Sequence, residues 1–332
     1  MTFRLPGSRA IAVATAAIAA FTIAAPMSTA QAQAYPSRPI RVIVPFPAGG
    51  GTDIIAREVA NKVSVTEGWT IVIENRAGSG GNLGVDAAAK AAPDGYTLVL
   101  GQTSNLAINP TLYPKLPYNP EKDLSAVSLV ASAPLVLVVA TDSPYKTLAD
   151  VVAAAKAKPG ALNYASSGNG TVAHLATEQF QKIAGVDFTH VPYKGAAQGA
   201  TDLIGGQIQM YMSSVPTLIG HIRNGKMRAL AVTSAKRNAD LPNVPTVDES
   251  GYKGFEAVTW FGMAGPAALP KEVVTRLNVA FNKAIQSPDV QKKLGAQGAD
   301  VMGGTPEAFA ALIKSETLRW GAIVKSSGAK VD

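Results

Sequence analysis

The sequence predicts an α/β protein in which short buried strands alternate with amphipathic helices. Two observations support this fold class. Short apolar runs recur along the chain, and the segments between them carry apolar residues four positions apart, the spacing of one helix face. The 332 residues are 47% hydrophobic and 16% charged, which permits a large core and argues against disorder. This strand–helix order is typical of a mostly parallel sheet covered by helices.

A targeting segment precedes the alternating region. Arg4 and Arg9 give a short positive start, a run of apolar residues follows, and small residues then offer Ala-x-Ala sites. This combination is typical of a secretory signal peptide, and its apolar run is shorter than the ~20 residues that a membrane-spanning helix needs. We therefore expect residues 1–34 to be removed by cleavage after Ala34, or alternatively after Ala32, which predicts a periplasmic protein.

The first part of the mature chain predicts a strand–helix–strand–helix–strand unit. In the first expected helix, Ile55, Val59 and Val63 fall on one face. The expected strands are 40–45, 70–74 and 97–101, and the expected helices are 52–63 and 82–91.

The middle of the chain repeats the alternation and predicts a second α/β unit. Leu175, Phe180 and Ile183 share one face of an expected helix. The expected helices are 148–158, 171–183, 196–204 and 215–224, and the expected strands are 163–165, 188–191, 209–212 and 228–233.

Two apolar runs stand at the borders of this second unit. The run 134–141 begins with a proline, and the run 257–262 predicts another strand; helices are then expected over 271–286, 288–297 and 305–326. We predict one lobe from residues 35–135 plus 257–332 and another from residues 136–256. Strands near 135–141 and 257–262 would cross between the lobes, as a hinge for lobe closure. This crossing rests in part on a family resemblance.

Composition excludes several kinds of chemistry. The chain has no cysteine, so it forms no disulfide and offers no thiolate as a nucleophile or metal ligand. Without Arg4 and Arg9, 28 basic residues face 23 acidic ones, a net charge of +5. The basic residues are scattered and have no interleaved aromatics, which argues against nucleic acid, while a mild positive field favours anions.

The first candidate binding loop is Pro45–Asp53, with the sequence PFPAGGGTD between a strand and a helix. Glycines allow backbone N–H groups to converge on a ligand, and a helix N-terminus adds a positive field. The loop lacks the G-x-x-x-x-G-K-[ST] pattern, which disfavours a nucleotide phosphate. The alternative is a tight turn in which Thr52 or Asp53 caps the helix.

The second candidate is Ser166–Thr171, with the sequence SSGNGT at the start of another helix. Ligands of open α/β sheets bind outside the carboxyl ends of strands, and both loops follow such ends. One loop in each lobe favours an anion site between them. A third loop, Gly78–Gly84, resembles a dinucleotide fingerprint, but Leu83 stands where glycine is required. A turn with Asn82 as a helix cap is the better interpretation.

Enzymatic chemistry has little support. The histidines are His174, His190 and His221, at no metal-ligand spacing, and neither H-E-x-x-H nor G-x-S-x-G occurs. Asp53 and Asp202 have no nucleophile to activate. His174 follows the second loop, where it either lines a cleft or packs as an ordinary helix residue. We expect no catalytic residue, no metal and no cofactor.

Other polar groups stand near strand ends, where they either contact a ligand or belong to ordinary loops. They are Thr103–Asn105, Tyr193–Gly195 and Ser213–Ser214, while Phe46 and Trp260 offer an apolar wall.

Several motifs together resemble a known group, the Bug-type receptors of the tripartite tricarboxylate transporter family. The resemblance covers nearly the whole mature chain, and the order and spacing of the motifs are highly specific. The motifs are Tyr35–Ile40, Pro45–Asp53, Glu74–Gly84, Ala92–Thr97, Val191–Gly195, Leu241–Val247 and Glu249–Gly251.

The resemblance implies a two-lobe periplasmic binding protein fold of the second type, with the ligand in the interlobe cleft. It implies that backbone and hydroxyl groups of the two glycine loops hold a carboxylate, partly through water. The ligand-binding residues so implied are Phe46, Ala48, Gly49, Gly50, Thr52, Asp53, Ser167, Gly168, Asn169, Gly170 and Thr171; Thr103, Ser104 and His174 are added for their positions.

The expected function is a monomeric receptor for a small carboxylate solute, without chemistry of its own. Its partners would be the membrane subunits of a tripartite tricarboxylate transporter, or a sensor protein. Amino acids, di- and tricarboxylates and aromatic acids all remain open as ligands. The alternatives are an envelope enzyme that acts on small carboxylates, which needs a general base, and a structural protein of the envelope.

Overall fold

The computed structural model describes residues 1–2 and 35–331 of the chain. The arginines, the apolar run and the cleavage positions expected for the signal peptide lie outside the described residues. The chain divides into two units, Met1–Ser37 and Arg38–Asp332, and the second holds the strands and helices.

The strands of the second unit form one mixed sheet in the order β2-β1-β3-β9-β4-β7-β5-β6, with β10 and β8 also paired to β4. Their bounds are β1 Ile40–Val44, β2 Ile71–Asn75, β3 Thr97–Gln102, β4 Leu124–Ala140, β5 Asn163–Ser166, β6 Thr189–Pro192, β7 Met210–Ser214, β8 Met227–Val232, β9 Val258–Pro266 and β10 Asp300–Val301.

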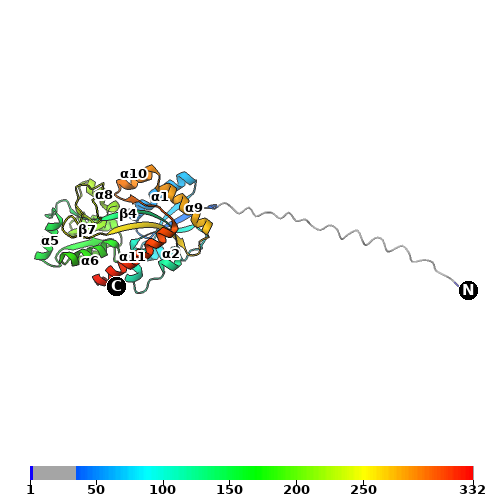
Figure 1. Ribbon diagram of the computed structural model, residues 1–332, viewed down its shortest axis with the longest axis horizontal. Coiled ribbons are helices and arrows are strands. Elements are labelled where there is room, and N and C mark those ends of the chain that lie inside the picture. The colour runs from blue at the N-terminus through cyan, green and yellow to red at the C-terminus, as the bar shows by residue number, and fades with distance from the viewer. Residues whose placement is uncertain (3–34, 332) are drawn as a thin grey trace. The chain divides into compact units, whose positions relative to one another are not determined.

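Helices cover both parts of this sheet (Figure 1). The long ones are α1 Gly51–Glu67, α2 Asn82–Ala89, α5 Leu148–Ala157, α6 Val172–Ala184, α7 Ala196–Ile204, α8 Val215–Arg223, α9 Lys271–Ile285, α10 Pro288–Ala296 and α11 Pro306–Ser327. Shorter turns are η1 Ser79–Gly81, η2 Ser104–Ile108, α3 Asn109–Leu112 and α4 Pro120–Asp123.

Strand β4 belongs to both parts of the sheet and defines two lobes. Its first half pairs with β9, from Leu124 opposite Pro266 to Pro134 opposite Val258. Its second half begins at Leu135 and pairs with β7 and β8. The first lobe therefore holds β1–β3, β9, β10 and the first half of β4. The second lobe holds β5–β8 and the second half of β4.

The expected hinge strands need adjustment. The strand expected over 134–141 begins already at Leu124, and the one expected over 257–262 does not cross, because β9 pairs only with β3 and β4 in the first lobe. The second crossing lies just before β9, where the N–H of Ala257 donates to the carbonyl of Thr233 at 2.9 Å. The lobe boundaries at 135/136 and 256/257 stay predictions.

We predicted a mostly parallel sheet, but the strands are parallel only at the two ends of the sheet and antiparallel in its centre. β1 pairs in parallel with β2 and β3, and β5 pairs in parallel with β6 and β7. Around β4 and β9 the pairs are antiparallel, because the chain that returns from the second lobe runs back beside the strand that left the first.

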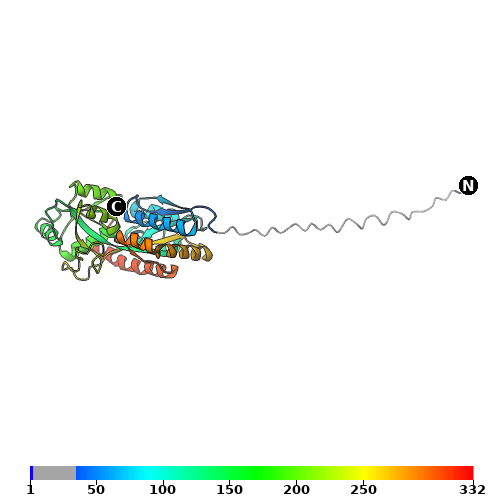
Figure 2. The same cartoon turned by 90° about the horizontal axis from the view of Figure 1, so that it is seen from above.

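Apolar helix faces form the core as expected. Ile55, Val59 and Val63 of α1 are at most 1% exposed. In both views α1 lies alongside α9 (Figures 1 and 2). Helix α11 buries Trp320 and contacts both η2 of the first lobe and α6 of the second.

Among the described residues, no helix is both long and apolar enough to cross a bilayer.

Candidate ligand-binding site

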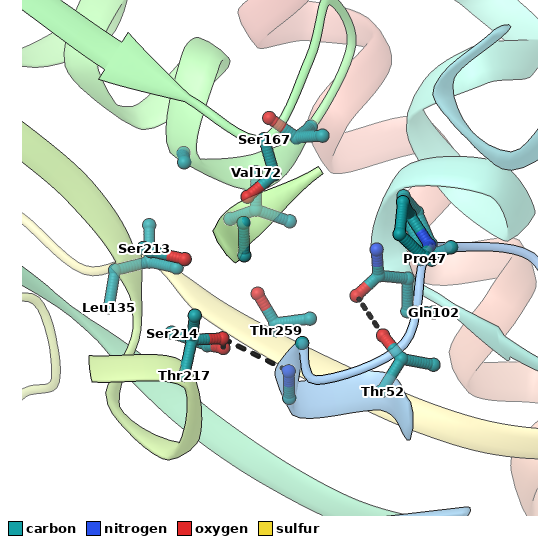
Figure 3. Close-up of a pocket in the computed structure, with 16 residues that line it drawn as sticks. Pro47, Thr52, Gln102, Leu135, Ser167, Val172, Ser213, Ser214, Thr217 and Thr259 are labelled. Atoms are coloured by element: carbon teal, nitrogen blue, oxygen red, sulfur yellow. Dashed lines mark hydrogen bonds between the residues drawn. The ribbon is translucent and has the colours of Figure 1, made fainter. Parts of the chain in front are cut away.

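A small cavity of about 50 Å³ lies where the two lobes meet, and we call it the inner cavity (Figure 3). Hydroxyl, amide and backbone groups line it, together with some apolar side chains. The lining residues are Phe46, Pro47, Gly50, Gly51, Thr52, Gln102, Leu135, Ser167, Thr171, Val172, Ala173, Ala196, Ser213, Ser214, Thr217 and Thr259. No charged side chain belongs to this set.

The first loop reaches the inner cavity because a buried carboxylate holds its backbone. The Asp53 carboxylate accepts hydrogen bonds from the N–H of Gly49 at 3.0 Å and from Nδ2 of Asn75 at 2.9 Å. Nδ2 of Asn75 also donates to the carbonyl of Phe46 at 3.0 Å. Gly49 has φ +81°, a conformation that favours glycine. Both ends of the turn are thus tied to the same pair of side chains.

Arg57 completes this network. Its Nε donates to Oδ2 of Asp53 at 3.0 Å, and its terminal nitrogen donates to Oδ1 of Asn75 at 2.9 Å. Burial raises the pKa of Asp53, but the hydrogen bonds from Arg57, Gly49 and Asn75 outweigh it and hold that pKa below its usual range. Asp53 is 4% exposed and does not line the inner cavity. It positions the loop.

The start of α1 faces the second lobe. The backbone N–H of Gly51 donates to Oγ1 of Thr217 at 3.0 Å, so a hydroxyl of one lobe caps a helix of the other. Oγ1 of Thr52 donates to Oε1 of Gln102 at 3.4 Å. Figure 3 shows both bonds at the edge of the cavity, with Thr259 between them.

The second loop is a compact turn that caps α6. Oγ1 of Thr171 donates to the carbonyl of Gly168 at 2.8 Å and accepts from the N–H of His174 at 3.4 Å. Gly168 and Gly170 have φ values of +129° and +77°. The turn therefore depends on glycine at both positions, and it directs Ser167 and Thr171 into the inner cavity.

His174 supports this turn from behind. Its Nδ1 accepts from the N–H of Gly170 at 3.3 Å, and its ring stacks on His190 with the centroids 4.2 Å apart. Burial lowers the pKa of His174 to about 4. Burial, reinforced by His174, lowers the pKa of His190 to about 3. Both rings are neutral at pH 7, and neither lines the inner cavity.

The structure brings five of the expected ligand residues to the inner cavity: Phe46, Gly50, Thr52, Ser167 and Thr171. The other expected residues do not line it: Gly49 and Asp53 support the first loop, and Gly170 and His174 support the second. Ala48 is exposed at the tip of the first loop.

Thr103 and Ser104 are fully buried in the first lobe, because the chain enters η2 at this point. Oγ1 of Thr103 accepts the N–H of Trp260 at 2.9 Å. Gly168 and Asn169 line a neighbouring, larger cavity.

Sequence reasoning missed three lining residues, Gln102, Thr217 and Thr259, and it named Ser213–Ser214 only as a possible ligand contact outside the expected ligand set. The strand-end position of Ser213–Ser214 was a usable signal. Thr217 carried none, because its place depends on contact between lobes.

In the described part of the chain, no three His, Cys, Asp or Glu side chains stand close enough to share a metal ion.

Comparisons with known proteins agree with this fold. Residues 55–329 match the model of the tripartite tricarboxylate transporter family receptor. Protein BugT of Bordetella pertussis is 41% identical over 325 residues, 98% of this chain and 99% of that protein. Two solved structures are similar over nearly their full lengths. R. palustris Rpa4515 with adipate has 35% identity and a TM-score of 0.87, covering 90% of this chain and 100% of that one.

The second structure is MatC (Rpa3494) from Rhodopseudomonas palustris with bound malate. It has 33% identity and a TM-score of 0.83, covering 87% of this chain and 100% of that one. Family model, relative and structures all span both lobes. This chain therefore belongs to the tripartite tricarboxylate transporter receptor family, the group of the Bug proteins.

Proposed function

We propose that this chain is a periplasmic receptor that binds a small carboxylate in the inner cavity and delivers it to membrane subunits of a tripartite tricarboxylate transporter. The observation that carries the proposal is the cavity itself. Both lobes contribute to it, and its polar groups are hydroxyls, an amide and the backbone at the start of α1. Such groups hold an anion through hydrogen bonds and the positive end of a helix.

A carboxylate fits these groups better than a cation does. No Asp or Glu lines the inner cavity, so a cation would meet no opposite charge. Adipate and malate, bound by the two similar structures, support the same class of ligand here. Ordered water would bridge the remaining distances, since bridged contacts bind nearly as well as direct ones.

The site favours binding over catalysis. A general base must reach the ligand, and no Asp, Glu, His, Lys or Arg lines the inner cavity. Ser166 and His190 form a close pair, with Oγ and Nε2 2.7 Å apart, which would favour an enzyme. Ser166 is fully buried and outside the cavity, so its hydroxyl has no substrate to attack.

Lobe closure supplies the mechanism. Only the closed arrangement places groups of both lobes on one ligand, so the ligand stabilises that state. The closed receptor then presents one continuous surface to the transporter, or to a sensor protein. We propose that it acts as a monomer.

Thermal unfolding of residues 35–332 with a panel of small carboxylic acids tests the receptor proposal. A ligand that binds only the native state raises the midpoint as its concentration increases. A protein that responds to no acid, and from which denaturation releases no small molecule detectable by mass spectrometry, would contradict the proposal.

A further inference from the structure

Two stacked histidines lie directly behind the second binding loop. The rings of His174 on α6 and His190 on β6 are almost parallel, with an interplanar angle of 8° and centroids 4.2 Å apart. The ring of Tyr164 on β5 also stacks on His190, at 4.7 Å. Neither imidazole lines the inner cavity, so the proposed receptor function gives them no contact with the ligand. A histidine that titrates behind a binding loop can control that loop instead.

The two rings hold the two glycines of the loop. Nδ1 of His174 accepts the N–H of Gly170 at 3.3 Å. Nε2 of His190 lies 2.7 Å from Oγ of Ser166, and the same oxygen accepts the N–H of Gly168 at 3.2 Å. The histidine pair therefore fixes the backbone of a turn whose neighbouring side chains line the inner cavity.

The bond from Gly170 determines where His174 carries its proton. Because Nδ1 accepts, the proton of the neutral ring is on Nε2, which lies 4.0 Å from the carboxylate of Glu178. A second proton would have to bind Nδ1. The ring would then present a donor to the backbone N–H of Gly170, and two donors form no hydrogen bond. Protonation of His174 therefore breaks the bond that supports Gly170.

The groups around His174 act on this second proton in opposite directions. Glu178, which also accepts the hydroxyl of Tyr164 at 2.7 Å, favours a charged ring. His190 disfavours it, since two stacked imidazolium ions repel each other. Burial has the largest effect and lowers the pKa of His174 to about 4. Among the described residues, no ion pair joins His174 to α3, which faces Gly170, or to α11, which packs against α6.

The first lobe covers the turn that His174 supports. A methyl group at Gly170 would stand 2.9 Å from Oδ1 of Asn109 and 2.9 Å from Cδ2 of Leu112, both on α3. His174 itself is 5% exposed. Separation of the lobes would remove α3 from the turn and admit water to it, which makes the ring easier to protonate.

We propose that His174 is a positioning residue that holds the second loop only while its ring is neutral, so that acid opens the cleft and releases the ligand. Linkage sets the direction. The ring has a pKa closer to the ordinary value of 6.5 in the open state than in the closed one. Affinity is therefore complete above pH 6.5 and is lost as the pH falls toward 4. This inference rests on the proposed receptor function and adds its regulation.

Calorimetric titration of residues 35–332 at pH 7.5, 6 and 5 tests the switch. The probe is the acid that binds most tightly among adipate, malate, glutarate, glutamate and benzoate. Between pH 7.5 and pH 5 the affinity of the wild type should fall by about three- to thirty-fold, and the upper value applies if opening restores the ordinary pKa of His174. Circular dichroism verifies that the protein is folded at each pH.

His174→Gln is the decisive variant. Its side-chain carbonyl can accept the N–H of Gly170 at any of these pH values, so its affinity should fall much less than that of the wild type. The comparison uses the change with pH within each protein, so a general weakening by the substitution cancels. Protonation of the acid itself is common to both proteins and cancels as well.

Two further variants make the result specific. His190→Gln leaves the bond between His174 and Gly170 in place and should keep the steep loss of affinity. His221→Gln removes the third histidine of the chain, which lies in the last turn of α8 and outside the inner cavity. This variant should follow the wild type at every pH.

Proton release gives a second measurement. Titrations at pH 5 in buffers of different ionisation enthalpy count the protons that leave on binding. The wild type should release more protons than His174→Gln, because closure expels one from the ring. A purely structural role of His174 would not produce this difference.

An equal loss of affinity with pH in the wild type and in His174→Gln, or equal proton release by the two, would overturn the switch and leave the receptor proposal intact. A wild-type protein that binds no acid of the panel would overturn both.

Discussion

At the scale of single residues, Asp53 is the group on which the first binding loop depends. It makes no contact with the inner cavity, but its two oxygens hold Gly49, Asn75 and Arg57. A buried carboxylate with three donors stabilises the fold because each bond is charge-assisted. We therefore expect Asp53 to affect binding through the backbone of the loop.

The change Asp53→Asn tests this role. The amide keeps the shape but loses the charge, so the free energy of unfolding should fall by about 1–3 kcal/mol. Because the folded carboxyl has a lowered pKa, its contribution is present above the ordinary pKa of 3.8 and is lost as the pH falls through the folded value. Urea unfolding of both proteins at several pH values measures it. A stability difference that persists undiminished into strong acid would contradict this account.

The pair His174 and His190 predicts a second pH dependence. Unfolded histidine binds a proton near pH 6.5, whereas burial keeps His174 neutral down to about pH 4. Stability should therefore be complete above pH 6.5 and decrease by up to about 3 kcal/mol as the pH falls toward 4. The groups that face the His174 ring are His190 and Glu178, whose carboxylate lies 4.0 Å from Nε2.

His174→Gln checks this prediction, since the glutamine carbonyl can still accept the N–H of Gly170. The variant should show a shallower loss of unfolding free energy between pH 7 and pH 4.5 than the wild type. Parallel curves for the two proteins would assign the pH dependence to other groups.

At the scale of elements, Thr171 links helix capping to the binding site. It caps α6 and lines the inner cavity, whereas Thr147 caps α5 with a capping box and lines neither cavity. Thr171→Ala and Thr147→Ala should each lower stability by about 1 kcal/mol, because each removes one N-cap. Only Thr171→Ala should weaken ligand binding. Equal affinities in the two variants would exclude Thr171 from the site.

The helices could be predicted closely from the sequence, and strand β4 could not. Helix α7 has the predicted bounds, because its apolar spacing and flanking glycines are unambiguous. Pro134 argued for a strand boundary, since proline interrupts a ladder of hydrogen bonds. In the structure it sits where β4 leaves its last pair with β9 and begins its pairs with β7 and β8. A missing N–H is tolerated at this change of partners.

The segment after β3 shows a second limit of sequence reasoning. Thr103 and Ser104 are polar and follow a strand, which favoured a place at the ligand. The chain instead forms η2, a π-helical turn that places both side chains inside the lobe. Such a turn lacks the regular spacing by which an α-helix is recognised.

At the scale of the whole second unit, contact between the lobes decides which residues share the cavity. The bond from Gly51 to Thr217 joins positions 166 residues apart. Periodicity and loop chemistry predict each lobe separately, but they contain no information on how one lobe meets the other. The rule that ligands bind outside the carboxyl ends of strands predicted that the two glycine loops face each other, but no rule predicted Gln102, Thr217 and Thr259 as their neighbours.

Close approach of the lobes also depends on glycine, which yields the last prediction. A methyl group at Gly195 would stand 2.6 Å from Cγ of Pro47 in the opposite lobe, and a proline ring cannot rotate away. The backbone of Gly195 is extended, with φ 166°, so alanine fits the second lobe by itself. Gly195→Ala should leave the stability of the free protein almost unchanged and prevent full closure.

The expected result for Gly195→Ala is a loss of ligand affinity of about ten-fold or more. Part of the binding free energy must then offset the steric contact between the added methyl and Pro47 in the closed state. Gly220→Ala is the control. Gly220 lies in α8 of the second lobe and does not line the inner cavity, and an added methyl there meets nothing within 4 Å, so this variant should bind and close normally. Calorimetry gives the affinities, and small-angle scattering with saturating ligand gives the compaction. If Gly195→Ala bound and compacted as Gly220→Ala does, the contact between Pro47 and Gly195 would not limit closure, and the ligand would have to be held by a more open cleft.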